Sequence, residues 1–460
     1  MQNVDLLVRA EFLYPVTGGA PVIPDGEVAI VANRIVYAGP RKPDGHWHAA
    51  RTIAGAGRAV LPGFVNAHCH TASIVFRSQT DDHAAKAALL NVAFRMEKDI
   101  SDAQWQLLGT VGCADMLRAG ITTINDIWYN PQALARTVAE CGLRAQIANK
   151  VFDVRLEALC RDDYTRYRDT GQARLRHGVE FVEQWEGAAN GRITTRIGTH
   201  APDTCDAGLW REARAEATRL GVGMHTHAAQ SVGEVDHILT KHGCGPMEYL
   251  RDNGVLAPDI VLAHLTLATD GDLAAVRETG AAYAHCPTIY PRRGRYPRLE
   301  EILSLGIPTG FGTDWMLNDP FEGMRMAIQA MRLRLGDPGA MTCEQALRLH
   351  TIDAARVIGM SDQIGSLETG KKADLITVNL DRPHLQPYYG APQSLVFYAK
   401  SSDVDTSIID GQIVLEGGQP TRLDLQRAMA NLGTHVAAWR GRLSELGSTA
   451  VAGPGCPCCG

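Results

Sequence analysis

Strand-like and helix-like segments alternate through the middle of this 460-residue chain. Strands separated by helices form parallel sheets, and eight such units over roughly 250–300 residues fit a closed (β/α)8 barrel. An open, doubly wound sheet is the alternative, but no G-x-G-x-x-G follows the first strand. The strand candidates are AVLPGFVNAHCH, GITTINDIW, RAQIANKVF, RITTRIGTH, GVGMHTHAAQ, DIVLAHLTL, GAAYAHCPTI and IPTGFGTDW.

The two ends of the chain share a different pattern. Residues 4–58 and about 363–418 contain short β-rich runs broken by Gly, Pro and Asn. A single core stops growing at roughly 250–300 residues, so a large domain with a smaller one is expected. The sequence predicts an α/β fold: a (β/α)8 TIM barrel over 59–362, a small β-sandwich domain from 1–58 and 363–420, and a C-terminal helix with a flexible tail over 421–460.

Composition and charge narrow the possible partners. The net charge is −6 and no run of Lys or Arg occurs, which argues against nucleic acid as a partner. No stretch of about 18 uncharged apolar residues exists, so no membrane span is expected. Asp5, Arg9 and Glu11 interrupt the N-terminal segment before a signal-peptide core could form. We therefore expect a cytoplasmic protein.

The cysteines do not form a disulfide pattern. The chain has 11 of them, and eight are scattered singly through its body. This distribution is typical of reduced, buried thiols. The other three, Cys456, Cys458 and Cys459, crowd the terminal GPGCPCCG, where Gly and Pro favour a mobile tail over a soft-metal or redox site.

Polar residues lie at or just beyond the C-terminal ends of the predicted strands. In a barrel, that end of the strands is the catalytic face. A random distribution of polar residues would not favour this position, so the pattern predicts one site at the barrel mouth. The residues are His68, His70, Asp126, His200, His225, His227, His264, His285 and Asp314.

The spacing of the histidines indicates a metal. His68 and His70 close the first strand, and residues i and i+2 of a strand face the same side. His225 and His227 end the fifth strand in the same way, and Asp314 ends the eighth. Imidazoles with a carboxylate suit a divalent ion such as zinc. A bound ion with one open position lowers the pKa of its water from 15.7 to about 7.

Several motifs together resemble a known family. LPGFVNAHCH, MHTHAAQ, AHLTL, AHCPTIY and GFGTDW, with the closing IGSLETGKKADLITVN, are similar to the deaminase and chlorohydrolase branch of the amidohydrolase superfamily. That branch includes guanine and S-adenosylhomocysteine deaminases and the s-triazine hydrolases. The resemblance covers roughly residues 4–420 and implies a metal-dependent hydrolase.

The resemblance also implies roles for individual residues. His264 resembles the histidine that polarises the substrate, and Asp314 would take a proton from the attacking water. His200 and Glu97 resemble substrate-contacting residues, although a solvated helix face explains Glu97 as well. The residues that resemble the family's ligands for one divalent metal ion, zinc or else Fe²⁺, Mn²⁺ or Co²⁺, are His68, His70, His227 and Asp314.

One position departs from the family pattern. Family deaminases carry H-x-x-E after the fifth strand, whereas this chain has Gln230 three residues after His227. An amide cannot transfer a proton as a general acid, and acid–base help is typically worth about 10²–10⁴-fold. Two acids could compensate: Glu234, for which a structural role is favoured, and Asp203, interpreted as a substrate contact or proton carrier.

Three further features admit two interpretations each. His285 contacts the substrate or is a hydrogen-bonded structural histidine. Lys150 could be carboxylated and bridge two metals, as a lysine does in some members of the superfamily. We favour the interpretation that it is a charged residue at a strand end, and we expect one metal. The arginines that follow the seventh strand form a solvated loop or else recognise an anionic or carbonyl-bearing substrate. They are Arg292, Arg293, Arg295 and Arg298.

The leading hypothesis is a mononuclear metal-dependent hydrolase that attacks a C–N bond of a small nitrogen heterocycle, with catalytic roles for His264, Asp314 and Gln230. The first alternative is hydrolysis of a C–Cl or C–S bond, since Gln230 suits a leaving group that needs little protonation. The second is a non-catalytic ligand-binding relative. The resemblance further implies a homo-oligomer, a dimer or larger.

Overall fold

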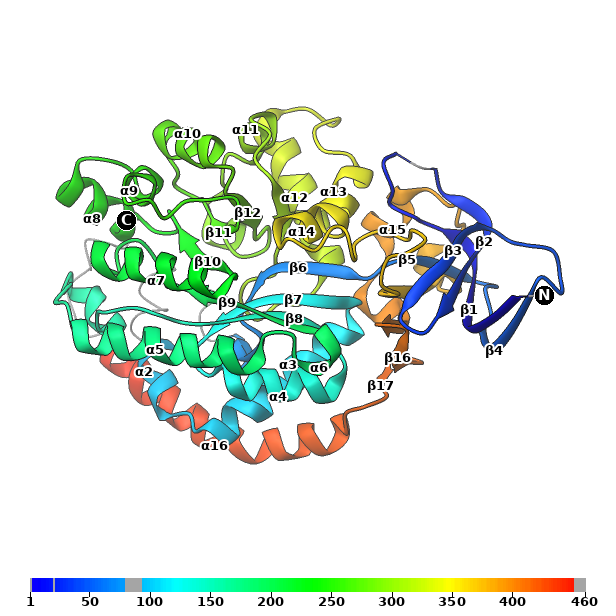
Figure 1. The fold of residues 1–460 in the computed structure, drawn as a ribbon, viewed down its shortest axis with the longest axis horizontal. Helices are drawn as coiled ribbons and strands as arrows, with labels where there is room; N and C mark the ends of the chain where they lie inside the picture. The colour runs from blue at the N-terminus through cyan, green and yellow to red at the C-terminus, as the bar shows by residue number, and fades with distance from the viewer. Residues whose placement is uncertain (1, 20, 79–92, 451–460) are drawn as a thin grey trace.

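The computed structural model describes residues 2–19, 21–78 and 93–450, and the three-cysteine tail lies outside these ranges. Two sheets organise the described residues (Figure 1). An eight-stranded parallel sheet forms the nearly closed barrel, and a mixed sheet joins strands from both ends of the chain. The prediction of a TIM-type barrel beside a separate β region is confirmed.

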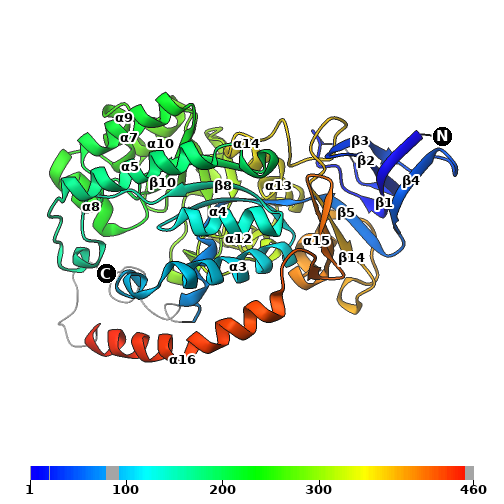
Figure 2. The ribbon, with the colours of Figure 1, turned by 60° about the horizontal axis from the view of Figure 1, so that its bottom comes forward.

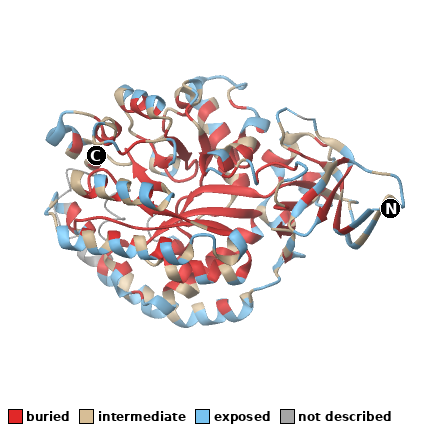
Figure 3. Ribbon diagram, in the orientation of Figure 1, coloured by how far each residue is buried: buried red, intermediate tan, exposed pale blue. Residues whose placement is uncertain are grey.

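The barrel strands follow chain order around the sheet, each pairing in parallel with the next. Most of their residues are buried on both faces, because helices cover the outside and side chains fill the inside (Figure 3). The strands are β6 (Phe64–Cys69), β7 (Ile121–Trp128), β8 (Arg144–Asn149), β9 (Ile193–Gly198), β10 (Gly223–Ala228), β11 (Ile260–His264), β12 (Ala282–His285) and β13 (Thr309–Phe311).

Backbone contacts just beyond the first and last strands bring the barrel ends together. Cys69 and Asp314 form an isolated parallel bridge. The amides of Thr313 and Asp314 donate to the His68 carbonyl at 3.1 and 3.0 Å, and the His70 amide donates to the Asp314 carbonyl at 3.2 Å. The two H-x-H residues therefore lie beside Asp314, although the sequence separates them widely.

Helices follow most barrel strands and pack on the outside of the barrel (Figure 1). Local signals fix their ends: Ser101 and Gln104 form a capping box at the start of α3, and left-handed Gly142 ends α4. The α-helices of this part are α2 (Phe94–Met96), α3 (Asp102–Arg118), α4 (Pro131–Cys141), α5 (Arg168–Trp185), α6 (Ala188–Gly191), α7 (Ala207–Leu220), α8 (Val232–His242), α9 (Pro246–Asp252), α10 (Asp270–Thr279), α11 (Leu299–Ser304), α12 (Pro320–Leu335), α13 (Cys343–Leu349) and α14 (Ile352–Val357).

Short 3₁₀ turns occupy several loops at the barrel mouth and near the second sheet. The turns are η1 (Thr71–Phe76), η3 (Glu97–Asp99), η4 (Leu156–Arg161), η5 (Pro291–Arg293), η6 (Pro383–Leu385) and η7 (Ser401–Asp403).

Within the described ranges, no helix is long and apolar enough to cross a bilayer.

The second sheet unites the chain ends, as predicted. Strand β14 pairs with β5, and β5 pairs with β1, so the C-terminal strands extend the N-terminal ones. Its strands are β1 (Gln2–Leu13), β2 (Ile23–Val31), β3 (Arg34–Pro40), β4 (Trp47–Ile53), β5 (Arg58–Pro62), β14 (Leu375–Asn379), β15 (Val404–Ile409), β16 (Gln412–Glu416) and β17 (Gln419–Pro420), with helix α15 (Pro392–Tyr398) beside them.

The first predicted barrel strand divides between the two sheets. Residues 58–62 form β5 in the terminal sheet, and β6 of the barrel begins at Phe64. Gly63 stands between them, and a Cβ atom there would collide with the Thr122 side chain. The uninterrupted apolar run hid this break, because its periodicity does not distinguish one strand from two.

The last helix, α16 (Leu425–Ala450), leaves the terminal sheet and runs along α3 on the outside of the barrel (Figure 2). Its buried Ala428 and Leu446 join a cluster with Trp105 of α3 and Met96 of α2. Arg442 donates to the Asp99 carboxylate at 2.6 Å. The C-terminal helix thus covers the segment that carries Glu97.

A buried ion pair connects the barrel to the terminal sheet. The guanidinium of Arg144, at the start of β8, donates to both oxygens of Asp374 at 2.7 and 3.0 Å. The Asp374 carboxylate also accepts the Asp410 amide at 2.8 Å. Arg144 and Asp374 are 2% and 3% exposed, so neither charge can turn to water.

Removing one partner of this pair should therefore be costly. We expect Asp374→Ala to destabilise the protein by about 3–5 kcal/mol, because it leaves the buried Arg144 guanidinium with only the longer contact to the Asp410 carboxylate at 3.3 Å. Urea unfolding followed by circular dichroism measures the effect. Asp44→Ala, which breaks the exposed pair with Arg41, is the control and should leave the midpoint almost unchanged. Equal midpoints for the two variants would contradict the structural role of the buried pair.

Candidate active site

The predicted metal ligands meet at the barrel mouth. His68, His70 and His227 place one ring nitrogen each within 4.8 Å of one another. The Nε2 atoms of His70 and His227 lie 3.2 Å apart, and the Asp314 Oδ1 lies 3.3 Å from His70 Nε2 and 3.5 Å from His68 Nε2. All four residues are buried. His68 lies in β6 and His227 in β10, whereas His70 directly follows β6 and Asp314 follows β13.

The hydrogen bonds of these rings show which of their nitrogens face the site. The Nδ1 of His70 contacts the Ile127 carbonyl at 2.8 Å, and the Nδ1 of His227 contacts the His200 carbonyl at 2.6 Å. A carbonyl only accepts, so both Nδ1 atoms carry hydrogen and both Nε2 atoms present lone pairs to each other. Burial lowers the pKa of His70 to about 4, so no proton bridges them at neutral pH. A cation fits this donor set, and the carbonyls act as the usual supports for metal-binding imidazoles.

His68 completes the set from the inside of the barrel. Its Nδ1 contacts His225 Nε2 at 2.8 Å, while its Nε2 is buried and has no hydrogen-bond partner. The two histidines of the second H-x-H pair therefore play different parts: His227 faces the site, and His225 supports His68 from behind. The family resemblance had implied His227, and not His225, as the metal ligand of this pair, and that role stays a prediction.

A second group overlaps the first. His68, His264, Cys286 and Asp314 also place one possible ligand atom each within 4.8 Å of one another. Burial raises the pKa of the Cys286 thiol well above its usual range, so the sulfur is a neutral group and a poor ligand. Cys286 directly follows His285 at the end of β12, but no pattern in the sequence marked it as a possible ligand.

The backbone at His264 is unusual. Its φ is +89°, a left-handed conformation that L-residues rarely adopt. The hydroxyl of Tyr283 donates to the His264 carbonyl at 2.8 Å and lies 2.8 Å from the Nδ1 of His285. Because the hydroxyl hydrogen is used on the carbonyl, the His285 ring donates to the tyrosine oxygen. The geometry thus gives His285 a support function behind His264.

A small pocket at the barrel mouth is lined by His70, His227 and Asp314, and we call it the reaction pocket. Gln230 also lines it. The Glu234 carboxylate accepts the backbone amides of Ala229 at 2.7 Å and of Gln230 at 2.9 Å. Burial raises the pKa of Glu234 to about 8, with Asp203 adding to the shift. Both carboxylate oxygens of Glu234 are thus occupied in fixing the turn that presents Gln230, which favours the structural role expected for this acid.

The reaction pocket is small, about 30 Å³. His200 contributes to its wall, with its Nδ1 3.0 Å from the Thr204 hydroxyl. Lys150 enters from the end of β8, so a residue interpreted as a charged strand end in fact faces the site. The lining residues are His70, Phe94, Lys150, His200, His227, Gln230, His264, Tyr290, Arg293, Asp314 and Trp315.

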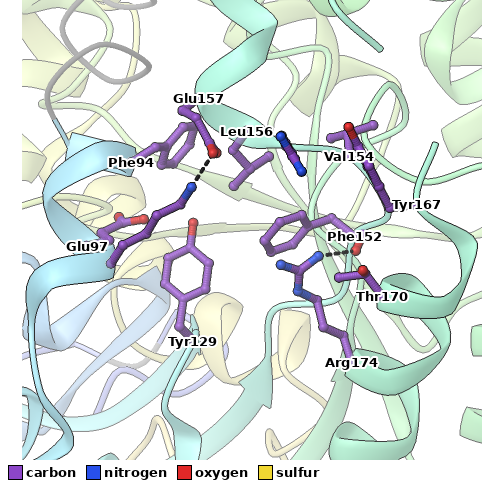
Figure 4. Close-up of a pocket in the computed structure, with 12 residues that line it drawn as sticks. Phe94, Glu97, Tyr129, Phe152, Val154, Leu156, Glu157, Tyr167, Thr170 and Arg174 are labelled. Atoms are coloured by element: carbon purple, nitrogen blue, oxygen red, sulfur yellow. Dashed lines mark hydrogen bonds and ion pairs between the residues drawn. The ribbon is translucent and has the colours of Figure 1, made fainter. Parts of the chain in front are cut away.

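A larger pocket of about 530 Å³ adjoins the first and shares Phe94 with it. Figure 4 shows Glu97 and Tyr129 on one side and Phe152, Tyr167 and Arg174 on the other. Glu97 is 8% exposed, and its Oε1 has no hydrogen-bond partner. Burial raises the pKa of its carboxyl to about 7, against the opposing effect of Lys150. Glu97 therefore belongs to a pocket wall and not to a solvated helix face.

Two predicted substrate contacts lie outside both of these pockets. Asp203 is 5% exposed and accepts from the Tyr164 hydroxyl at 3.3 Å. His285 is 1% exposed and packs against Tyr296 and Phe311. Neither is among the lining residues of the reaction pocket or of the larger pocket. Their predicted contacts with substrate stay predictions.

Comparison with known proteins agrees with this geometry. Residues 59–414 match the Amidohydrolase family. The 5-methylthioadenosine/S-adenosylhomocysteine deaminase of Symbiobacterium thermophilum is 37% identical over 425 residues, which cover 89% of this chain and 93% of the relative. The 5'-deoxyadenosine deaminase of Methanosarcina acetivorans is 29% identical, with 92% and 96% covered.

Solved structures share the same architecture. A zinc-bound adenosine deaminase from Xanthomonas campestris superposes with a TM-score of 0.87 at 25% identity, covering 96% of this chain and 99% of the other. The zinc complex of the atrazine chlorohydrolase TrzN from Arthrobacter aurescens gives 0.82 at 20% identity, covering 94% and 100%, a likeness of fold alone. The chain with this histidine-lined barrel mouth belongs to the amidohydrolase family.

Proposed function

We propose that the protein is a metal-dependent hydrolase that holds one zinc ion with His68, His70, His227 and Asp314 and hydrolyses a C–N bond of a small aminated heterocycle. The facing Nε2 lone pairs of His70 and His227, 3.2 Å apart, carry this proposal. Such an arrangement is unfavourable without a cation. Family membership supports a hydrolase acting on C–N bonds other than peptide bonds, and the relatives are named deaminases.

Held by His68, His70, His227 and Asp314, a zinc ion would lower the pKa of a bound water to near neutral. The chain's own residues manage the proton and the substrate. Burial raises the pKa of Asp314, but the neighbouring His264, His68 and His70 outweigh it and hold that pKa well below its usual range. The Asp314 carboxylate is thus ionised at neutral pH, and the family resemblance makes it the group that would accept a proton from the attacking water. The His264 ring lies beside it and stabilises the oxygen that is added to the substrate carbon.

The two pockets divide the substrate between them. The reaction pocket is too small for more than the reacting edge of a ring, so the remainder of a nucleoside-sized molecule would extend past Phe94 into the larger pocket. The free Oε1 of Glu97 can accept one hydrogen bond from a substrate hydroxyl or amine there. The names of the relatives favour an adenine-derived compound as this substrate.

Gln230 supports a second candidate reaction. The amide cannot protonate a departing amine, and Glu234 is held by two backbone amides. Chloride or thiolate leaves without such protonation. Hydrolysis of a C–Cl or C–S bond in a triazine-like or thiocarbamate-like compound is therefore the alternative, and a protein that binds its ligand without turnover is the third possibility. We further propose a homo-oligomer, a dimer or larger, on the family resemblance, and a cytoplasmic location.

Zinc loading and substrate screening test the proposal directly. The zinc-loaded protein should hydrolyse at least one member of a panel of aminated, chlorinated and thiocarbamate heterocycles that includes 5'-deoxyadenosine. Asp314→Asn should reduce kcat by more than about 10²-fold, because it removes the proton acceptor. Chelation should abolish turnover and lower the thermal midpoint. An unchanged midpoint after chelation, with the zinc shown to be gone, would refute the metal site.

The role of Gln230 is tested by restoring the acid. Gln230→Glu should raise the rate of ammonia release from amino-heterocycles by about 10-fold or more, since the carboxylic acid can protonate the amine. The rate for chlorinated compounds should stay the same within about threefold. Gln230→Ala is the control for loss of the amide alone. A glutamate variant that gains nothing on any amine would show that proton transfer at this position does not limit the reaction.

The support behind His264 gives a further prediction. Tyr283→Phe should destabilise the protein by about 1–3 kcal/mol, because the buried His264 carbonyl and the His285 ring lose their partner. The same change should lower kcat more than it raises KM. Tyr296→Phe is a matched control, since its hydroxyl donates to the Ala327 carbonyl of α12. Equal effects of both variants on kcat would contradict a specific role for Tyr283.

A further inference from the structure

Two cationic side chains of the reaction pocket, those of Lys150 and Arg293, form no ion pair with any carboxylate of residues 2–19, 21–78 and 93–450. Lys150 follows β8, the third strand of the barrel, and Arg293 lies in the loop after β12, the seventh. Third and seventh strands stand opposite each other in an eight-stranded barrel, so the two cations reach the pocket from opposite sides. Both line it together with Asp314.

Three aromatic rings surround the Lys150 ammonium, but it makes few hydrogen bonds. Its Nζ lies 4.9, 5.1 and 4.5 Å from the ring centres of Phe94, Trp128 and Tyr129. The side chain's one hydrogen bond within the described ranges goes to the Tyr129 hydroxyl at 3.3 Å, and no carboxylate there lies within ion-pair distance. An ammonium carries three donors, so two remain free.

Burial makes this arrangement significant. Lys150 is 5% exposed, and a buried charge is costly unless it is paired. The ring faces compensate in part through cation–π attraction, worth about 2 kcal/mol or more when desolvated. They provide no hydrogen-bond acceptor. Desolvation lowers the pKa of Lys150 to about 8, and the nearby Glu97 and Asp314 oppose that shift, so the side chain is mainly an ammonium at pH 7.

Arg293 differs from the other arginines of its loop. Arg298 donates to Asp270 at 2.6 Å and also pairs with Glu301 at 3.1 Å. Among the described residues, Arg293 has neither a hydrogen bond from its side chain nor an ion pair with a carboxylate. The one carboxylate that lines the pocket among these residues is Asp314, which the proposed zinc ion would engage.

We propose that Lys150 and Arg293 together recognise an anionic oxygen of the substrate, so that the preferred substrate is a heterocycle bearing a carboxylate or an ionised ring oxygen. Both groups donate hydrogen bonds only, which excludes a substrate donor as their natural partner. Guanidinium and ammonium bonds to such an oxygen are charge-assisted and are the strong kind. The proposal deepens the proposed function and rests on it for the identity of the reacting pocket.

The test compares charged and neutral probes of the same size. Binding of nicotinate against nicotinamide, benzoate against benzamide, and 5-carboxycytosine against cytosine-5-carboxamide is measured by titration calorimetry on the zinc-loaded protein. We expect at least one pair to show a preference of about 10-fold or more for the carboxylate, the range of one charge-assisted hydrogen bond. No preference in any pair would overturn the proposal.

Variants separate the two cations from the zinc ion, which also attracts carboxylates. Lys150→Met and Arg293→Gln should each reduce the preference at least threefold, and Lys150→Arg should retain most of it. Lys241→Met and Arg298→Gln are the matched controls: the first lysine is exposed on α8, and the second residue is the paired arginine of the same loop. Zinc content and unfolding midpoints confirm that each variant is intact. A preference that survives in the Lys150→Met/Arg293→Gln double variant would assign it to the metal and overturn the proposal.

These outcomes are independent of turnover. If carboxylated probes bind through Lys150 and Arg293 but no heterocycle is hydrolysed, the recognition pair stands and the hydrolase function fails. If neutral heterocycles are hydrolysed and Lys150→Met leaves both kcat and KM unchanged, the hydrolase function stands and the recognition pair fails.

Discussion

The contact that closes the barrel determines where the chemistry can occur. The amides of Thr313 and Asp314 donate to the His68 carbonyl, and the His70 amide donates back to Asp314. These bonds join the first strand of the barrel to the segment that follows its last strand. Without them the H-x-H pair and the Asp314 carboxylate would belong to opposite edges of an open sheet. Because the contact is made by backbone atoms, the fold itself brings the metal-ligand candidates together.

That pre-positioning brings groups together that repel one another unless a cation lies between them. Four buried residues hold lone pairs and a carboxylate close together, and burial keeps the pKa of His70 near 4. Left-handed backbone at His264 and Asp314 adds strain. The surroundings oppose collapse through fixed carbonyl contacts: Ile127 and His200 hold the rings of His70 and His227 from behind. Folding and cation binding are therefore coupled at this position.

Much of this arrangement could be predicted from the sequence, because its signals are local. Strand alternation gave the direction of His68 and His70, and the repeated strand–helix pattern placed the polar residues on one face. What could not be predicted depends on contacts between distant segments. The break at Gly63, the Tyr283 support for His264 and the ring faces around Lys150 all require knowing which strands are neighbours. Asp203 sits at the end of the correct strand, yet it contacts Tyr164 instead of lining the reaction pocket.

Gln230, which stands where family deaminases carry a glutamate, affects both the possible leaving group and the charge of the pocket. Among the described lining residues, Lys150 and Arg293 carry positive charge and Asp314 is the one carboxylate. A glutamate at position 230 would add a second carboxylate. Gln230 therefore removes a proton donor and at the same time leaves the pocket more positive. An anionic oxygen on the substrate is favoured by the second effect, and a leaving group that needs no proton is favoured by the first. The two consequences of one residue thus point to an acidic heterocycle with a weakly basic leaving group as the compound that this pocket suits best.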